Sequence, residues 1–147
     1  MHRSPALLAL SPAEAAERVL AQAGDDWTRA FLDELDRRIR TQPLERLIAL
    51  WGLSGAGAAR LFGVSRQAFS KWIDEGPPAD RAATVTALAA ATDLLERYLK
   101  RENIPAVVRR TAPALGGRSL LQIAESGGAE EVLQRVKAMF DLRRIQP

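Results

Sequence analysis

The chain has 147 residues, a length that allows one domain or two small ones with a hydrophobic core. It has no cysteine, so no thiolate can bind a metal or act as a nucleophile. Its single histidine is His2, beside the N-terminus, where we do not expect a metal site or acid–base catalysis. The formal net charge is +3, and no run of about 18 apolar residues that would span a membrane is present. We therefore expect a cytoplasmic protein that is not an enzyme and that holds no metal or cofactor.

Residue usage favours helices, and the charges are unevenly distributed. Alanine and leucine are abundant while β-branched and aromatic residues are few, which predicts an all-α fold. Residues 43–99 carry six basic and six acidic side chains, whereas residues 100–147 carry nine basic and five acidic ones. The middle of the chain has no net charge, so a basic face there has to be local.

Residues 1–42 are interpreted as an N-terminal helical arm. Ser11 is expected to cap a helix over residues 12–23, because Glu14 follows three residues later and completes a capping box. No chemistry is indicated for this arm.

The arm continues in a second helix over residues 27–40. One stripe of this helix is apolar and consists of Trp27, Phe31, Leu35 and Ile39. Pro43 is expected to end the helix, because the residue before a proline is pushed out of the helical region. A short helix over residues 44–51 then begins the next part of the chain.

The stretch from Ala59 to Trp72 is the most informative in the sequence. Ala59 is a small residue where two helices cross, and four residues later Gly63 supplies the positive φ that closes a short turn. Phe69 and Trp72 stand three residues apart, on the face of the second helix that is expected to be buried. This pattern predicts a helix-turn-helix.

Residues 43–101 are therefore interpreted as a DNA-binding domain. Its further helices are expected over residues 54–62, 65–75 and 79–101, with Ser54 and Ser65 as the caps of the first two. The polar side chains left on the outer face are Arg60, Ser65, Arg66, Gln67, Ser70 and Lys71.

These six side chains match the chemistry of DNA recognition. Arg66 suits a bidentate contact with guanine and Gln67 one with adenine. Ser65 and Ser70 are short donors for bases or phosphates. Lys71 and Arg60 suit phosphates. One such helix binds weakly, so we expect a homodimer on a palindromic operator in double-stranded DNA.

Residues 102–147 are expected to form a small helical C-terminal domain. Ser119 caps a short helix, and an amphipathic helix follows over residues 129–140. The Gly116-Gly117 pair is not a phosphate-binding loop, because no strand precedes it and no Gly-Lys-Ser/Thr sequence surrounds it.

The two halves together resemble a known family. A helix-turn-helix followed by the sequence from Leu115 to Leu121, and then by a helix with Val132, Leu133 and Val136, is similar to the Xre/ParS/MbcA-type antitoxins of bacterial type II toxin–antitoxin pairs. The resemblance covers about residues 43–141. It implies an Xre-like helix-turn-helix bundle and a C-terminal domain that serves for dimerisation and grips a toxin.

The resemblance also implies a partner and a function. The usual toxin is a RES-domain protein that consumes NAD, and the antitoxin neutralises it and represses its own operon. The partner-binding loop implied here consists of Leu115, Gly116, Gly117, Arg118 and Ser119.

Two other interpretations stay open. Some relatives act as stand-alone dimeric transcriptional regulators without a toxin. The chain can also be an interaction protein whose helix-turn-helix has lost DNA binding, an interpretation favoured by the neutral middle region and by Asp74 and Glu75 at the end of the second helix.

Overall fold

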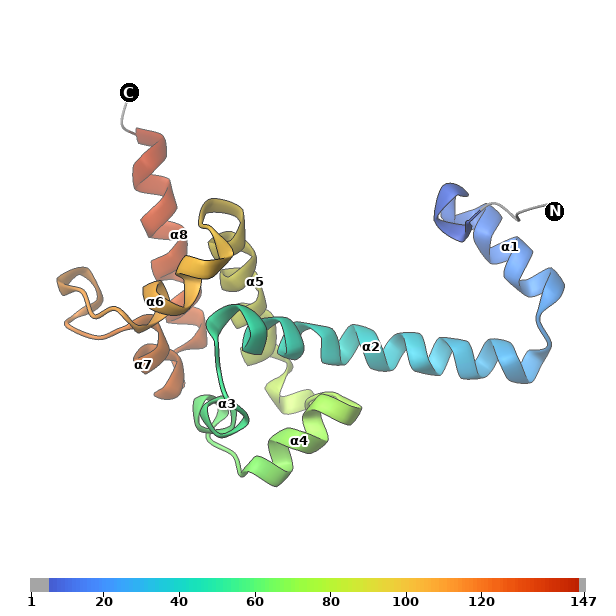
Figure 1. Cartoon of the computed structure of the whole chain (residues 1–147), viewed down its shortest axis with the longest axis horizontal. Coiled ribbons are helices and arrows are strands. Elements are labelled where there is room, and N and C mark those ends of the chain that lie inside the picture. The colour runs from blue at the N-terminus through green and yellow to red at the C-terminus, as the bar shows by residue number, and fades with distance from the viewer. Residues whose placement is uncertain (1–5, 146–147) are drawn as a thin grey trace. The chain divides into compact units, whose positions relative to one another are not determined.

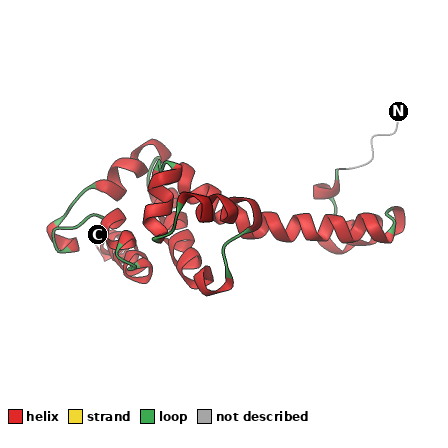
Figure 2. Ribbon diagram, turned by 90° about the horizontal axis from the view of Figure 1, so that it is seen from below, coloured by secondary structure: helices red, strands yellow, loops and turns green. Residues whose placement is uncertain are grey.

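A computed structural model describes residues 6–145 of the chain, with side chains for residues 6–141, so His2 lies outside the described residues. Every regular element within this range is a helix, which confirms the predicted all-α class (Figure 2). The contacts between residues divide the chain into two compact units, Met1–Arg37 and Arg38–Pro147.

The first unit contains the 3-10 helix η1 (Leu7–Ala9), the helix α1 (Pro12–Gln22) and the beginning of α2 (Asp25–Trp51). The predicted cap of α1 is confirmed: Ser11 Oγ accepts from the Glu14 N–H at 3.2 Å, and the Ser11 N–H donates to Glu14 Oε2 at 3.0 Å. None of the described residues of this unit is buried.

The predicted break at Pro43 is wrong, because α2 continues through the proline to Trp51. Proline inside a helix removes one hydrogen bond and costs about 3 kcal/mol. The helix is buried on both sides of this position, with Thr41 at 2% exposure and Leu44 at 0%. Continuing the helix keeps both residues in the core, so tertiary packing offsets the local preference of the proline.

The second unit contains the remaining helices. In chain order they are α3 (Gly55–Phe62), α4 (Arg66–Glu75), η2 (Ala79–Arg81), α5 (Ala82–Tyr98), η3 (Arg101–Asn103), α6 (Ile104–Arg109), η4 (Pro113–Leu115), α7 (Leu120–Glu125) and α8 (Ala129–Ile145). The helices expected over residues 54–62 and 65–75 are confirmed, together with their caps Ser54 and Ser65. The prediction of one long helix over residues 79–101 is wrong at both ends. Residues 79–81 form the 3-10 helix η2, and after Tyr98 the backbone of Leu99 is extended and the chain turns into η3.

The helices of the second unit share one hydrophobic core. Helix α5 packs along α8, where the rings of Tyr98 and Phe140 stack at 4.5 Å (Figure 1). Helix α7 packs against both α3 and α8, so the C-terminal helices and the helix-turn-helix stabilise each other.

Polar contacts fix the end of α2 within this core. The Trp51 indole N–H donates to Thr92 Oγ1 at 3.1 Å, and the Thr92 hydroxyl donates to the Leu88 carbonyl at 2.7 Å. Arg109 of α6 donates to the carbonyls of Trp51 at 2.7 Å and Gly52 at 2.9 Å. The last carbonyl of α2 and the one that follows it are thereby satisfied by a side chain that is distant in sequence.

An ion cluster joins the C-terminal part of α2 to α5. Arg46 donates to Asp93 and to Glu96 across the two helices. The hydrogen bond from Arg46 holds the pKa of Glu96 below its ordinary value, despite the opposing effect of desolvation.

No helix in the described part of the chain has both the length and the apolar character that crossing a membrane requires.

Candidate nucleic-acid interface

The turn between α3 and α4 is built by Gly63 and Ser65. Gly63 has φ +65°, and the Val64 N–H donates to the Ala59 carbonyl at 3.0 Å, which closes the end of α3. Ser65 Oγ accepts from the Ala68 N–H at 3.1 Å and so begins α4. The turn is therefore short, and its geometry follows from residues within the turn itself.

Three aromatic rings hold α4 against α3. Phe62 stacks on Phe69 at 5.8 Å with an interplanar angle of 14°, and Trp72 meets Phe62 edge-on at 5.5 Å. All three side chains are less than 9% exposed. The inner face of α4 is thus fixed by packing, and the opposite face is left to solvent.

Arg81 of η2 adds a polar contact to this packing. Its guanidinium donates to the Phe62 carbonyl at 2.9 Å and lies 5.7 Å from the centre of the Trp72 ring. This contact ties the segment after α4 to the end of α3. Sequence reasoning missed it, because no local pattern links residues nineteen positions apart.

All six side chains proposed for DNA contact are exposed. Five belong to α4 or its cap and one to α3: Ser65, Arg66, Gln67, Ser70, Lys71 and Arg60. Within α4, Arg66 and Ser70 are four residues apart and so are Gln67 and Lys71, so each pair lies one turn apart on neighbouring rows of the helix. The turn thus brings an arginine, an amide, two hydroxyls and a lysine to one outer face.

Acidic side chains limit the positive charge at the far end of α4. Lys71 Nζ lies 3.9 Å from Glu75 Oε2, and both side chains are about two-thirds exposed or more. Such an exposed pair contributes little to stability. It still lowers the local positive charge, so the first turn of α4, with Arg66 and Gln67, is the more favourable half for an anion.

A groove of about 440 Å³ runs along one side of α4. It is lined by Glu45, Ile48, Gly55, Arg66, Phe69, Ser70 and Ile73. Arg66 and Ser70 therefore lie on the side of α4 that borders this groove. The carboxylate of Glu45 gives the groove an acidic wall, which is unfavourable for a phosphate but compatible with the amino group of a base.

The loop proposed for partner binding is only partly exposed. Leu115 is 8% exposed, and Ser119 is 3% exposed and caps α7, accepting from the Gln122 N–H at 3.1 Å. Gly116 and Gly117 both have positive φ, +68° and +77°, and are exposed together with Arg118. The outer residues form the tip of the loop, and the two buried ones hold it in place.

Arg118 is anchored to α8. Its guanidinium lies 3.1 Å from Glu131 Oε1, and Arg135 lies 3.6 Å from the same oxygen. Arg135 also donates to the Ala114 carbonyl at 3.0 Å. Arg118 of the loop tip and Arg135 of α8 thus surround one glutamate of α8, and these three side chains together have a net positive charge.

Comparisons with known proteins give no further guidance. Neither the protein-family models, nor the curated proteins, nor the solved structures include a match to this chain.

Proposed function

We propose that this protein is a cytoplasmic homodimeric DNA-binding repressor that reads a palindromic operator with α4. The observation that carries the proposal is the pairing of α3 and α4 around Gly63. The buried rings of Phe62, Phe69 and Trp72 hold α4 so that its polar side chains lie on the outside. A helix presented in this way fits the major groove with its first turns at the base edges.

Each outer side chain has a role in this proposal. Arg66 donates to guanine O6 and N7, and Gln67 exchanges two hydrogen bonds with adenine. The Ser65 oxygen already accepts from the helix, so its hydroxyl hydrogen is the group offered to DNA. Ser70 contacts a base or phosphate, and Lys71 and Arg60 contact phosphates, which adds affinity but little sequence information.

The resemblance to Xre/ParS/MbcA-type antitoxins supports a second role. In this role the protein neutralises a toxin, of the RES-domain class, and represses the operon that encodes both. The exposed tip Gly116, Gly117 and Arg118 is the part of the implied loop that is available to a partner. Leu115 and Ser119 act by holding this tip.

A band-shift assay tests the DNA proposal, with the DNA immediately upstream of the protein's own coding sequence as the probe. Wild type should shift this fragment, and the Arg66→Ala/Gln67→Ala variant should lose at least tenfold in affinity, since each bidentate contact contributes about 1–3 kcal/mol. The control is Arg97→Ala/Gln134→Ala, which removes the same groups from exposed positions on α5 and α8. Equal affinity of both variants would contradict the role of α4.

The alternative is a stand-alone regulator without a toxin. It is favoured by the burial of Leu115 and Ser119, which leaves only part of the implied partner loop accessible. Co-expression with the product of the neighbouring gene distinguishes the two. An antitoxin should co-purify with that product and restore growth, and Arg118→Glu should weaken the complex while Arg110→Glu, another exposed arginine, should not. No complex with wild type would leave the stand-alone regulator as the function.

A further inference from the structure

Among its described residues, the first unit exposes large apolar side chains and buries none. Five of them are 41–56% exposed, and we call this set the arm face: Leu7, Trp27, Phe31, Leu32 and Leu35. In the second unit, by contrast, side chains of the same types are packed into a core. Apolar surface of this extent marks an interaction site.

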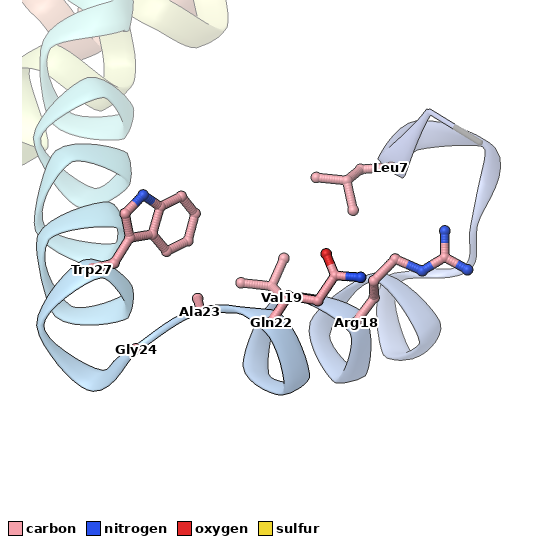
Figure 3. Close-up of a pocket in the computed structure, with 7 residues that line it drawn as sticks. All are labelled: Leu7, Arg18, Val19, Gln22, Ala23, Gly24 and Trp27. Atoms are coloured by element: carbon pink, nitrogen blue, oxygen red, sulfur yellow. The ribbon is translucent and has the colours of Figure 1, made fainter. Parts of the chain in front are cut away.

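The arm face is ordered by its own contacts. The rings of Trp27 and Phe31 stack at 5.2 Å with an interplanar angle of 7°. Figure 3 shows Trp27 directed from α2 toward Leu7 and Val19, across a cavity of about 470 Å³. The cavity is open between α1 and the first turns of α2, so an apolar side chain from outside can fill it.

The charges along α2 favour a second copy of the same helix. The first turn is acidic, with Asp25 and Asp26, whereas Arg37 and Arg38 follow the stripe at its other end. Arg37 also donates to Glu34 at 2.7 Å but remains 38% exposed. When two copies of the helix lie side by side in opposite directions, the acidic turn of each copy faces the basic turn of the other. In this arrangement the positive end of each helix dipole also lies near the negative end of the other, which is favourable. Two copies in the same direction would place like charges together.

The available area fits such a pair. At the observed exposures, the arm face offers on the order of 500 Å² of apolar surface per chain, if each side chain presents about 150–250 Å² when free. A standard interface buries about 800 Å² per partner, of which somewhat more than half is apolar. The arm face therefore supplies the apolar part of one standard interface.

We propose that the arm is the dimerisation surface of this protein, and that the arm face is covered by the arm face of a second copy in antiparallel orientation. Pairing through the arm leaves the C-terminal domain free to bind a different partner. This inference rests on the homodimer of the proposed function and names its surface. The association is measured without DNA, so its failure is distinguishable from a failure of α4 to bind DNA.

Light scattering coupled to gel filtration, without DNA, tests the proposal. Wild type should have the mass of two chains, and Phe31→Glu/Leu35→Glu should have half that mass, because four carboxylates would face each other in the pair. The matched control is Asp33→Lys, which changes the charge by the same two units at an exposed position on the opposite side of α2 and should stay dimeric. Circular dichroism should show equal helix content in all three, since the substituted residues are exposed. A monomeric wild type, or a double variant with the mass of two chains, would overturn the proposal.

Chemical cross-linking tests the orientation, because the chain has no cysteine of its own. Leu32→Cys lies near the middle of the helical pair and should cross-link to its counterpart with a short bis-maleimide. Asp25→Cys should not cross-link. In an antiparallel pair centred near Leu32, the two copies of residue 25 are about 20 Å apart along the helix axis, at 1.5 Å of rise per residue. Cross-linking of both variants would show a parallel pair, and cross-linking of neither would show that the arm faces do not meet. Either result would overturn the proposal.

Discussion

The hydroxyl of Thr92 determines how the buried indole of Trp51 is satisfied. Trp51 is fully buried and Thr92 is 1% exposed, so water does not replace a lost partner. The same hydroxyl accepts from the indole and donates to the Leu88 carbonyl. A single oxygen thus connects α2 with α5 where the two helices form the core.

Replacement of Thr92 by valine should therefore destabilise the protein. Thr92→Val keeps the shape of the side chain but leaves the indole N–H without an acceptor, which costs about 1–3 kcal/mol. Thr86→Val, the same change at an exposed position of α5, should stay within about 0.5 kcal/mol of wild type. Urea denaturation followed by circular dichroism measures both. Equal stability of Thr92→Val and wild type would show that the indole does not depend on this hydroxyl.

At the scale of helices, short-range signals in the sequence predicted the beginnings of helices well. Ser11, Ser54, Ser65 and Ser119 each cap a helix as expected, because the acceptor and the N–H that it serves lie three residues apart. The helix break at Pro43 was wrong because burial on both sides of the proline, which no local pattern reports, holds α2 together.

Contacts between residues that are far apart in the sequence were not predictable either, because no local pattern reports them. Arg81 and Arg109 bond to carbonyls nineteen and more than fifty residues away. The exposure of the residues proposed for DNA contact followed from helical periodicity, whereas the burial of Leu115 and Ser119 depends on the packing of α7 against other helices. Periodicity thus predicted the face of α4 but not the interior of the C-terminal loop.

The turn between α3 and α4 gives a prediction at the same scale. A Cβ added to Gly63 would have nothing within 4 Å, so Gly63→Ala should lose stability only through its φ of +65°, by about 1–2 kcal/mol. Gly55→Ala is the control, because Gly55 also has free space but no positive φ. It should be neutral or stabilising by up to about 1 kcal/mol. Thermal unfolding measures both variants, and a neutral Gly63→Ala would contradict the need for glycine in this turn.

The whole molecule combines two units that differ in how they use apolar side chains. The second unit buries them in one core that includes both the helix-turn-helix and the C-terminal helices. The first unit displays them on the arm face. In the function proposed here, the first unit supplies the second copy of α4 that a palindromic operator requires, and the second unit supplies the contacts with DNA.

The central claim is that two copies of α4 read DNA together, and selection from a random duplex library tests it most directly. Wild type should enrich an inverted repeat with half-sites about 10 base pairs apart, or a multiple of that spacing, and Arg66→Ala/Gln67→Ala should enrich nothing. Enrichment of no sequence by wild type, or of the same sequence by both proteins, would contradict the claim.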